Sequence, residues 1–184
     1  ALSPPSDADT LAYHFALPKQ FLNATRLEFV PRAVDGAVPL LIQMTYIPVL
    51  GLGGEKALTL WTMVTGWVLG LFVYTICRSH LNGRFSAVIT LILLTTPAII
   101  YGAGSGHVEV RNALFASLAA VAVSKALHSG LLRYAFLAGI TTGFFVGAKY
   151  LGLLFAAAAG ITMLTGAKKF KPSMIFSIGV IWNN

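Results

Sequence analysis

Long uncharged apolar runs, separated by short polar breaks, dominate the chain from residue 57 onward. A transmembrane helix needs about 20 mostly apolar residues, with a range of about 17–25. The clearest run, ALTLWTMVTGWVLGLFVYTIC, fills the interval between Lys56 and Arg78 without a charge. Further spans are predicted over residues 85–101, 112–128, 134–148 and 151–167, and a last one starts after Pro172. The pattern therefore predicts an all-α, polytopic transmembrane bundle of about five full spans and a truncated sixth.

The run at residues 38–53, VPLLIQMTYIPVLGLG, differs from these because two prolines and two glycines interrupt it. We expect an interfacial or re-entrant segment here rather than a full span. Small residues also recur at intervals of four, as Gly139, Gly143 and Gly147 and as Gly66 and Gly70. Such rows let two helix backbones approach closely in lipid, so they predict helix packing and no chemistry.

Composition supports the membrane interpretation, since 57% of the residues are hydrophobic and only 10% are charged. A soluble domain has about a quarter of its residues charged. The net charge of +7 would suggest nucleic acid in a soluble protein, but the basic residues here fall in short clusters between apolar runs. We therefore expect no nucleic-acid partner. The single cysteine, Cys77, excludes an internal disulfide and a cysteine metal cluster.

The charges also predict an orientation in the membrane. If the spans alternate, seven basic residues and no acid share one face, which the positive-inside rule makes cytoplasmic. These residues are Arg78, Arg84, Lys125, Arg133, Lys168, Lys169 and Lys171. All six acids then lie on the opposite side. We expect residues 1–54 to form a first extracytoplasmic loop with amphipathic interfacial helices, and residues 55–184 to form a helix bundle that is truncated at its C-terminus.

The first candidate for chemistry is SDADTLAYH, residues 6–14. Ser6 followed by Asp9 resembles a capping box, with Ser6 as the N-cap. Asp9 and Tyr13 are four residues apart, so they share a helix face. Two interpretations stay open. The segment is a capped amphipathic helix on the membrane surface, or Asp9, with Asp7, is a base or metal ligand.

Two further candidates lie in short breaks between spans. In GHVEVRN, residues 106–112, we expect His107 and Glu109 to diverge on a helix, whereas His107 and Arg111 share a face. Arg111 either anchors a helix end by extending toward the lipid headgroups or has a function, and an acid in so short a loop is a functional hint. Lys149, on the side that the positive-inside rule disfavours, either anchors to lipid headgroups or binds a phosphate.

Three stretches resemble bacterial GT-C-type membrane glycosyltransferases, including those similar to dolichyl-phosphate-mannose-protein mannosyltransferases. PPSDADTLAYHFALPKQFL resembles their first extracytoplasmic loop, GHVEVRNALFASLAAVAV their second, and GFFVGAKYLGLLFAA a later Lys-Tyr turn. The resemblance implies a bacterial inner-membrane enzyme that uses a polyprenyl-phosphate sugar donor. It makes Asp9, with Asp7 beside it, the leading catalytic candidate. Many relatives have adjacent Asp-Glu where this chain has Asp-Ala-Asp, so the choice between Asp7 and Asp9 stays open.

The resemblance also assigns the second-loop acid to Glu109 and the lysine of the turn to Lys149. A carboxylate would take the proton of an acceptor hydroxyl, and Lys149 or Arg111 would stabilise the phosphate leaving group. We expect Tyr13, His14 and His107 to contact the substrate. A single base implies direct displacement with inversion at the anomeric carbon. Alternatively, Asp9 and Glu109 jointly bind a divalent cation.

The acceptor of such an enzyme is a lipid, a glycan or a protein, and the reaction would serve cell-envelope glycan or lipid modification. Two other classes stay open from the sequence. A transporter or lipid flippase would place ionisable residues near the middle of the bilayer, and the predicted spans show none. A non-catalytic membrane scaffold would use its acids only as helix caps. The chain also begins without Met and ends inside an apolar run, so we expect a fragment of a longer protein.

Overall fold

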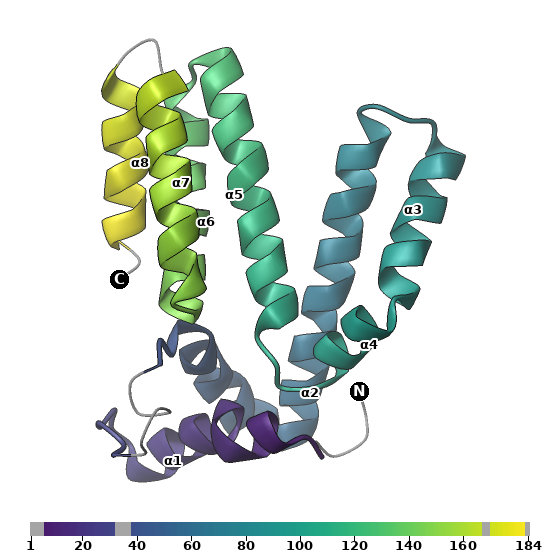
Figure 1. Cartoon of the computed structure of the whole chain (residues 1–184). Helices are drawn as coiled ribbons and strands as arrows, with labels where there is room; N and C mark the ends of the chain where they lie inside the picture. Colours follow the sequence, from purple (N-terminus) through teal and green to yellow (C-terminus); the bar gives the residue numbers. More distant parts are fainter. Residues whose placement is uncertain (1–5, 32–37, 167–169, 183–184) are drawn as a thin grey trace. The chain divides into compact units, whose positions relative to one another are not determined.

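The computed structural model describes residues 6–31, 38–166 and 170–182, and every regular element in these ranges is helical (Figure 1). A wide helical turn at Thr10–His14 leads into α1. The helices are α1 (Ala16–Ala24), α2 (Leu41–Arg78), α3 (Gly83–Thr95), α4 (Pro97–Gly104), α5 (Glu109–Ser129), α6 (Leu132–Ala148), α7 (Leu151–Gly166) and α8 (Phe170–Trp182). The predicted all-α class is confirmed.

Two of these helices, α2 and α5, are long and apolar enough to cross a membrane. Helices α3 and α4 pass the same test as a pair that is bent by 63°. The helices α6 and α7 are apolar but have only 17 and 16 residues, at the short end of the usual range. The protein is therefore an integral membrane protein. Two of the predicted spans are confirmed, or three if the bent pair is one span, and the remaining spans stay a prediction.

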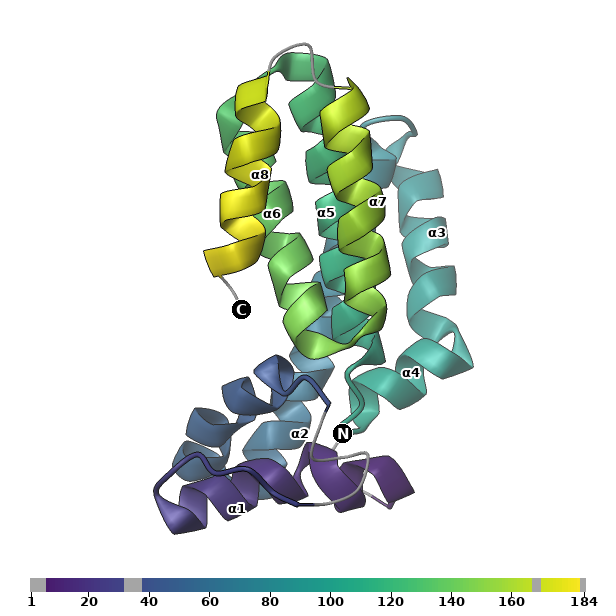
Figure 2. The ribbon, with the colours of Figure 1, turned by 60° about the vertical axis from the view of Figure 1, so that its left-hand side comes forward.

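Helix α2 is broken at Gly54, whose φ of 65° and ψ of −163° are not helical. Only glycine adopts such a backbone conformation readily, so the glycine fixes the break. The segment before it lies beside α1 in Figure 2, and an ion pair of 3.1 Å joins Lys19 of α1 to Glu55, just after the break. The boundary that the sequence predicted between residues 38–53 and the following span coincides with this break. Their interfacial location stays a prediction.

The helices form two compact units, which are described separately. The first unit contains residues 1–31 and 43–114. In it the predicted span 85–101 is two helices, because Pro97 opens α4 and Thr96 before it is extended, with a φ of −63° and a ψ of 126°. Proline disfavours the helical conformation in the preceding residue, which accounts for the bend.

The second unit contains residues 32–42 and 115–184. Its core is formed by alanines of α5, α6 and α7 together with Val123, Met163 and Phe176. Helices α6 and α8 touch through backbone, since a Cβ built on Gly139 would lie 2.3 Å from the carbonyl oxygen of Phe176. On the same helix, a Cβ on Gly147 would lie 2.8 Å from the Leu41 side chain. The packing role predicted for the glycine row is confirmed at these two positions.

Candidate functional site

The first loop is anchored at Asp7, which caps the helical turn that follows. The Oδ1 atom of Asp7 accepts the backbone N–H of Thr10 at 2.8 Å. This is the hydrogen bond of an N-cap, so the cap predicted at Ser6 is displaced by one residue. Burial acts to raise the pKa of Asp7, but the hydrogen bonds from Thr10 and the nearby His107 outweigh it and lower that pKa. Asp7 is therefore an anion at neutral pH.

The turn at Thr10–His14 is a π-helical turn, in which the Phe15 N–H donates to the Thr10 carbonyl at 3.0 Å. Such wide turns occur frequently at functional sites. The turn brings Thr10 and His14 to the interior, where His14 is 2% exposed. The Nδ1 atom of His14 lies 2.9 Å from Nε2 of Gln43. Burial, and then the charge of His107, lower the pKa of His14 to about 4, so His14 is neutral at pH 7.

The second loop meets the first through Gly106. The Gly106 N–H donates to Oγ1 of Thr10 at 3.0 Å, and its carbonyl accepts the hydroxyl of Tyr46 at 3.1 Å. A Cβ on Gly106 would lie 2.6 Å from Cγ2 of Thr10 and 2.7 Å from the ring of Phe15. Residue 106 therefore has to be glycine for the two loops to be this close.

His107 lies between two carboxylates from different loops. Its Nε2 is 3.1 Å from Oδ1 of Asp7, and its Nδ1 is 3.3 Å from Oε2 of Glu109. His107 and Asp7 are largely buried, whereas the Glu109 side chain is half exposed. The expectation that His107 and Glu109 diverge is wrong, because His107 precedes the first residue of α5 and does not follow helical geometry.

Arg111 points into the first unit and is only 6% exposed. One of its terminal nitrogens donates to the hydroxyl of Tyr46, its Nε donates to Oγ1 of Thr65 at 3.2 Å, and its guanidinium lies 4.7 Å from the centre of the Tyr46 ring. The other terminal nitrogen, Nη2, is buried without a hydrogen-bond partner. No carboxylate pairs with Arg111 within the described ranges. Arg111 is thus not an anchor that extends toward the lipid headgroups.

The remaining predicted residues are placed as follows. Asp9 is exposed, and its side chain forms no hydrogen bond or ion pair with another described residue. The Tyr13 ring packs on His14, with centroids 4.1 Å apart. Lys149 ends α6 as an exposed residue of the second unit. The structure therefore joins Asp7, His14, His107, Glu109 and Arg111 in the first unit, whereas Lys149 belongs to the second unit.

The sequence also left open, as an alternative, a divalent-cation site with Asp9 and Glu109 as its ligands. In the part of the chain that the structure describes, no three His, Cys, Asp or Glu side chains are arranged to hold a metal ion. The joint binding of a divalent cation by Asp9 and Glu109 stays a prediction.

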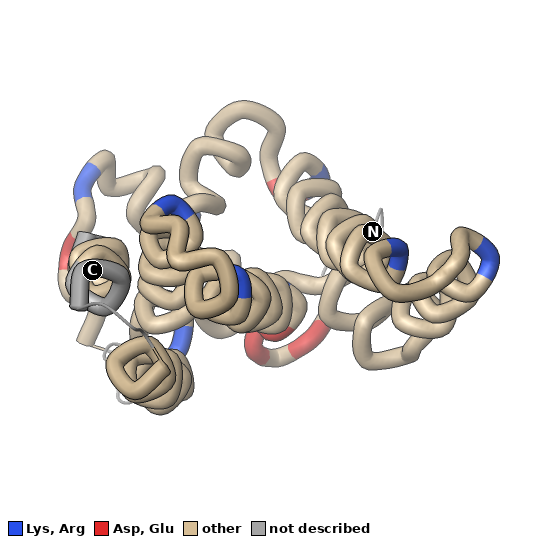
Figure 3. The backbone as a smooth tube through the Cα atoms, turned by 90° about the horizontal axis from the view of Figure 1, so that it is seen from above, with Lys and Arg blue, Asp and Glu red and all other residues tan. Residues whose placement is uncertain are grey.

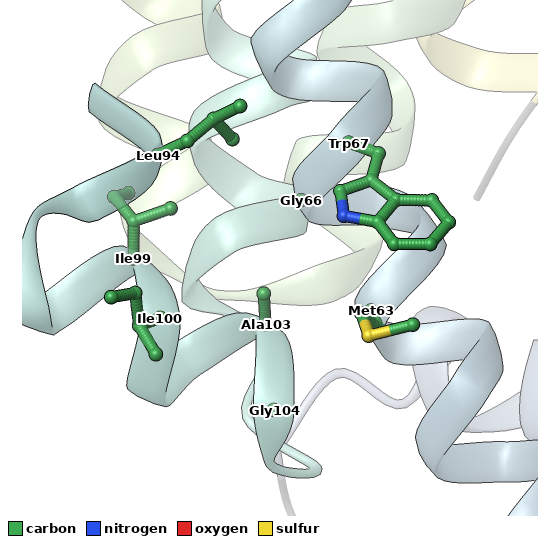
Figure 4. A pocket seen from close by; sticks show the side chains of 8 residues that line it. All are labelled: Met63, Gly66, Trp67, Leu94, Ile99, Ile100, Ala103 and Gly104. Atoms are coloured by element: carbon green, nitrogen blue, oxygen red, sulfur yellow. The ribbon is translucent and has the colours of Figure 1, made fainter. Parts of the chain in front are cut away.

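An apolar cavity of about 240 Å³ lies in the first unit, at the bend between α3 and α4 (Figure 4). Carbon and sulfur atoms dominate its lining, and no charged side chain contributes to it. The lining residues are Met63, Gly66, Trp67, Leu94, Ile99, Ile100, Ala103 and Gly104. The cavity suits a hydrocarbon chain better than a sugar.

Sequence reasoning missed four residues that hold the site together: Thr10, Gln43, Tyr46 and Thr65. Thr10 belongs to the motif that was singled out, but the other three lie in apolar runs. A polar side chain inside an apolar run is a signal in itself, because such groups are costly in lipid and are kept facing the protein interior. Gln43 and Tyr46 are 1% and 0% exposed.

Comparison with known proteins adds one finding. The sequence profile of the family described as dolichyl-phosphate-mannose-protein mannosyltransferase matches residues 38–182. The match includes Glu109, Arg111 and Lys149 and begins after Asp7 and Asp9. Comparisons with curated proteins and with solved structures give no match. Since the profile covers more than half of the chain, the chain belongs to the dolichyl-phosphate-mannose-protein mannosyltransferase family, which consists of GT-C-type membrane glycosyltransferases.

Proposed function

We propose that the protein moves a sugar from a polyprenyl-phosphate donor to an acceptor hydroxyl, with inversion, at the extracytoplasmic face of a bacterial inner membrane. The observation that carries this proposal is the contact of Asp7 with His107 and of His107 with Glu109. It brings two acidic loops together beside a buried arginine, and glycosyl transfer needs a carboxylate and a cation in such proximity. The family match supports the reaction class.

The carboxylates differ in their availability for proton transfer. One oxygen of Asp7 already accepts from Thr10 and faces His107. Asp9 is exposed, so its carboxylate can approach an acceptor hydroxyl. This supports Asp9 as the general base, a role that contributes about 10²–10⁴-fold to the rate. With a single base and no nucleophilic side chain, the acceptor oxygen bonds directly to the anomeric carbon as the bond from that carbon to the phosphate breaks. The configuration at the anomeric carbon is thereby inverted.

The donor requires a cation for its phosphate and an apolar surface for its chain. Arg111 has one terminal nitrogen without a partner, and a buried guanidinium without a carboxylate favours an anion nearby. We propose Arg111 for the phosphate, and the phosphate-binding role of Lys149, in the second unit, stays a prediction from the resemblance. The apolar cavity at the α3–α4 bend suits part of the isoprenoid chain. Tyr13 and His14 remain our candidates for contact with the sugar.

The distribution of charge supports the proposed side of the membrane. Charged positions are short segments between long uncharged stretches of helix (Figure 3). In the first unit, Arg78 and Arg84 flank the turn between α2 and α3, whereas Glu55 follows the break of α2 at Gly54 and Glu109 is the first residue of α5, in contact with His107 as Asp7 is. The positive-inside rule places the arginine turn in the cytoplasm and the acids outside.

The test uses the full-length protein in membranes and a panel of polyprenyl-phosphate sugars, with sugar release as the readout. Asp9→Asn is compared with the wild type at equal abundance, with and without a chelator. Glu28→Gln is the matched control, since Glu28 is an acid of the same loop that pairs with Arg26 at 2.8 Å. We expect Asp9→Asn to lose about 2–4 orders of magnitude, as removal of a general base would.

Three results would change the proposal. Full activity of Asp9→Asn would move the base to Asp7 or Glu109. Sensitivity to the chelator would make a divalent cation part of the site. Absence of transfer by the wild type with every donor and acceptor class would overturn the proposed function.

A further inference from the structure

We propose that His107 is a positioning residue, which holds the two loop carboxylates Asp7 and Glu109 in place and thereby orients the loop that carries Asp9. This inference rests on the proposed function, and it replaces the expectation that His107 contacts the substrate. Its basis is that residues about a hundred positions apart meet at one imidazole ring.

The geometry uses both nitrogens of the ring. Nε2 lies 3.1 Å from Asp7 and Nδ1 lies 3.3 Å from Glu109, so both nitrogens face a carboxylate oxygen. A ring in this arrangement has no free nitrogen for a substrate, and it lies between two carboxylates.

The ring is also held by its neighbours. Its centroid lies 5.4 Å from that of Tyr101 and 5.7 Å from that of His14, and its side chain is 18% exposed. Tyr101 belongs to α4 and His14 to the turn that follows Asp9. His107 is therefore packed against a helix of its own side of the contact, α4, and against the first loop, as a residue that sets the distance between the loops has to be.

The electrostatics explain why such a residue is needed. Without the imidazole, the ring that lies between the carboxylates of Asp7 and Glu109 would be lost, and Arg111 is directed to Tyr46 and Thr65 instead. Like charges repel, more strongly near a protein interior than in water. Repulsion would push the first loop away from the second. Asp9, two residues from Asp7, would move with it.

The test is a double-mutant cycle on the full-length protein in membranes, with His107→Gln, Asp7→Asn and the double variant. We expect His107→Gln to lower kcat about 10²-fold, the cost of a displacement of about 1 Å at a reacting group. KM for the donor should change by no more than about twofold, because the phosphate and chain contacts are elsewhere. The double variant should be no slower than the slower single variant, because His107 acts through Asp7.

The matched control is His80→Gln, since His80 is an exposed histidine in the turn between α2 and α3. Its kcat should equal that of the wild type. The proposal is overturned if His107→Gln keeps a normal kcat, if the loss appears only in KM, or if the losses of the two single variants multiply in the double variant.

Hydrogen exchange gives a second measurement that does not depend on activity. The amides of Thr10 and Leu11, bonded to Asp7, and of Gly106, bonded to Thr10, should exchange faster in His107→Gln than in the wild type. If the wild type transfers no sugar but these amides do exchange faster, the proposed function fails and the holding role of His107 stands. If the wild type transfers sugar and the amides are unchanged, the positioning role fails and the proposed function stands.

Discussion

Gly106 and Thr10 are joined by a hydrogen bond of 3.0 Å, from the glycine N–H to the threonine hydroxyl, across 96 positions of the chain. The carbonyl of the same glycine accepts from Tyr46. The backbone N–H and the carbonyl of Gly106 therefore both take part in connecting the two loops. The contact also requires the absence of a side chain, which makes it a sensitive point for mutation.

Gly106→Ala should destabilise the protein and lower sugar transfer, because its Cβ would lie 2.6 Å from Thr10 and 2.7 Å from Phe15. Overpacking of this kind costs about 1–3 kcal/mol of unfolding free energy. Gly51→Ala is the control, since a Cβ there would meet the Leu22 side chain at an ordinary 3.6 Å. Thermal unfolding in detergent and sugar transfer would measure both effects. Equal behaviour of the two variants would contradict the proposed contact.

Arg111→Met should separate stability from donor binding. Replacement of a buried, unpaired charge by an apolar side chain is often neutral or stabilising. We therefore expect a midpoint of unfolding no lower than that of the wild type, together with a KM for the donor raised at least about tenfold, the cost of about 1.4 kcal/mol of binding energy. Arg84→Met is the control, because Arg84 is exposed at the α2–α3 turn. A large loss of stability with an unchanged donor KM would show that Arg111 has a purely structural role.

His14 should make the protein less stable as the pH falls. Its pKa is about 4 in the folded protein against an ordinary value of 6.5, mainly because burial favours the neutral ring. Below pH 6.5 the unfolded chain binds a proton that the folded chain does not bind until about pH 4, so stability is complete above 6.5 and is lost as the pH falls between these values. The difference corresponds to about 3 kcal/mol at about 1.4 kcal/mol per pH unit.

The measurement is the unfolding free energy in detergent micelles at pH 7 and at pH 4. In His14→Gln, most of the decrease in unfolding free energy from pH 7 to pH 4 should be absent, because glutamine does not titrate. His80→Gln should keep it, since His80 is exposed. The same decrease in His14→Gln as in the wild type would show that other groups cause it.

Gly139→Ala should weaken the contact of α6 with α8. Its Cβ would lie 2.3 Å from the Phe176 carbonyl and 2.9 Å from the Gly179 backbone, and neither group can turn away as a side chain would. We expect a loss of at least about 1 kcal/mol, as for other overpacked positions. Gly160→Ala is the control, because its Cβ would meet Phe176 at an ordinary 3.8 Å. Alanine in place of a helical glycine should there be neutral or stabilising by about 0.5–1 kcal/mol. The midpoints of thermal unfolding in detergent compare the two, and an undiminished midpoint in Gly139→Ala would contradict the close packing.

The sequence by itself determined the class of the fold, the membrane location and most of the segment boundaries. Each depends on local chemistry, since the backbone N–H and C=O groups of a long uncharged run find their hydrogen-bond partners in lipid by forming a helix. The two loop motifs and the resemblance to GT-C-type glycosyltransferases were also visible at this level. The bend before Pro97 was missed, although its cause is local too.

Only the tertiary structure decided which polar residues form one site. Spacing along a helix placed His107 with Arg111, but His107 precedes the helix and meets Asp7 of the other loop, while Arg111 is held by Tyr46 and Thr65. Such contacts depend on how distant segments pack, and no periodicity within one segment encodes them. The partner of a buried charge is a property of the folded chain, because the cost of burial is paid only where the neighbouring segments exclude water.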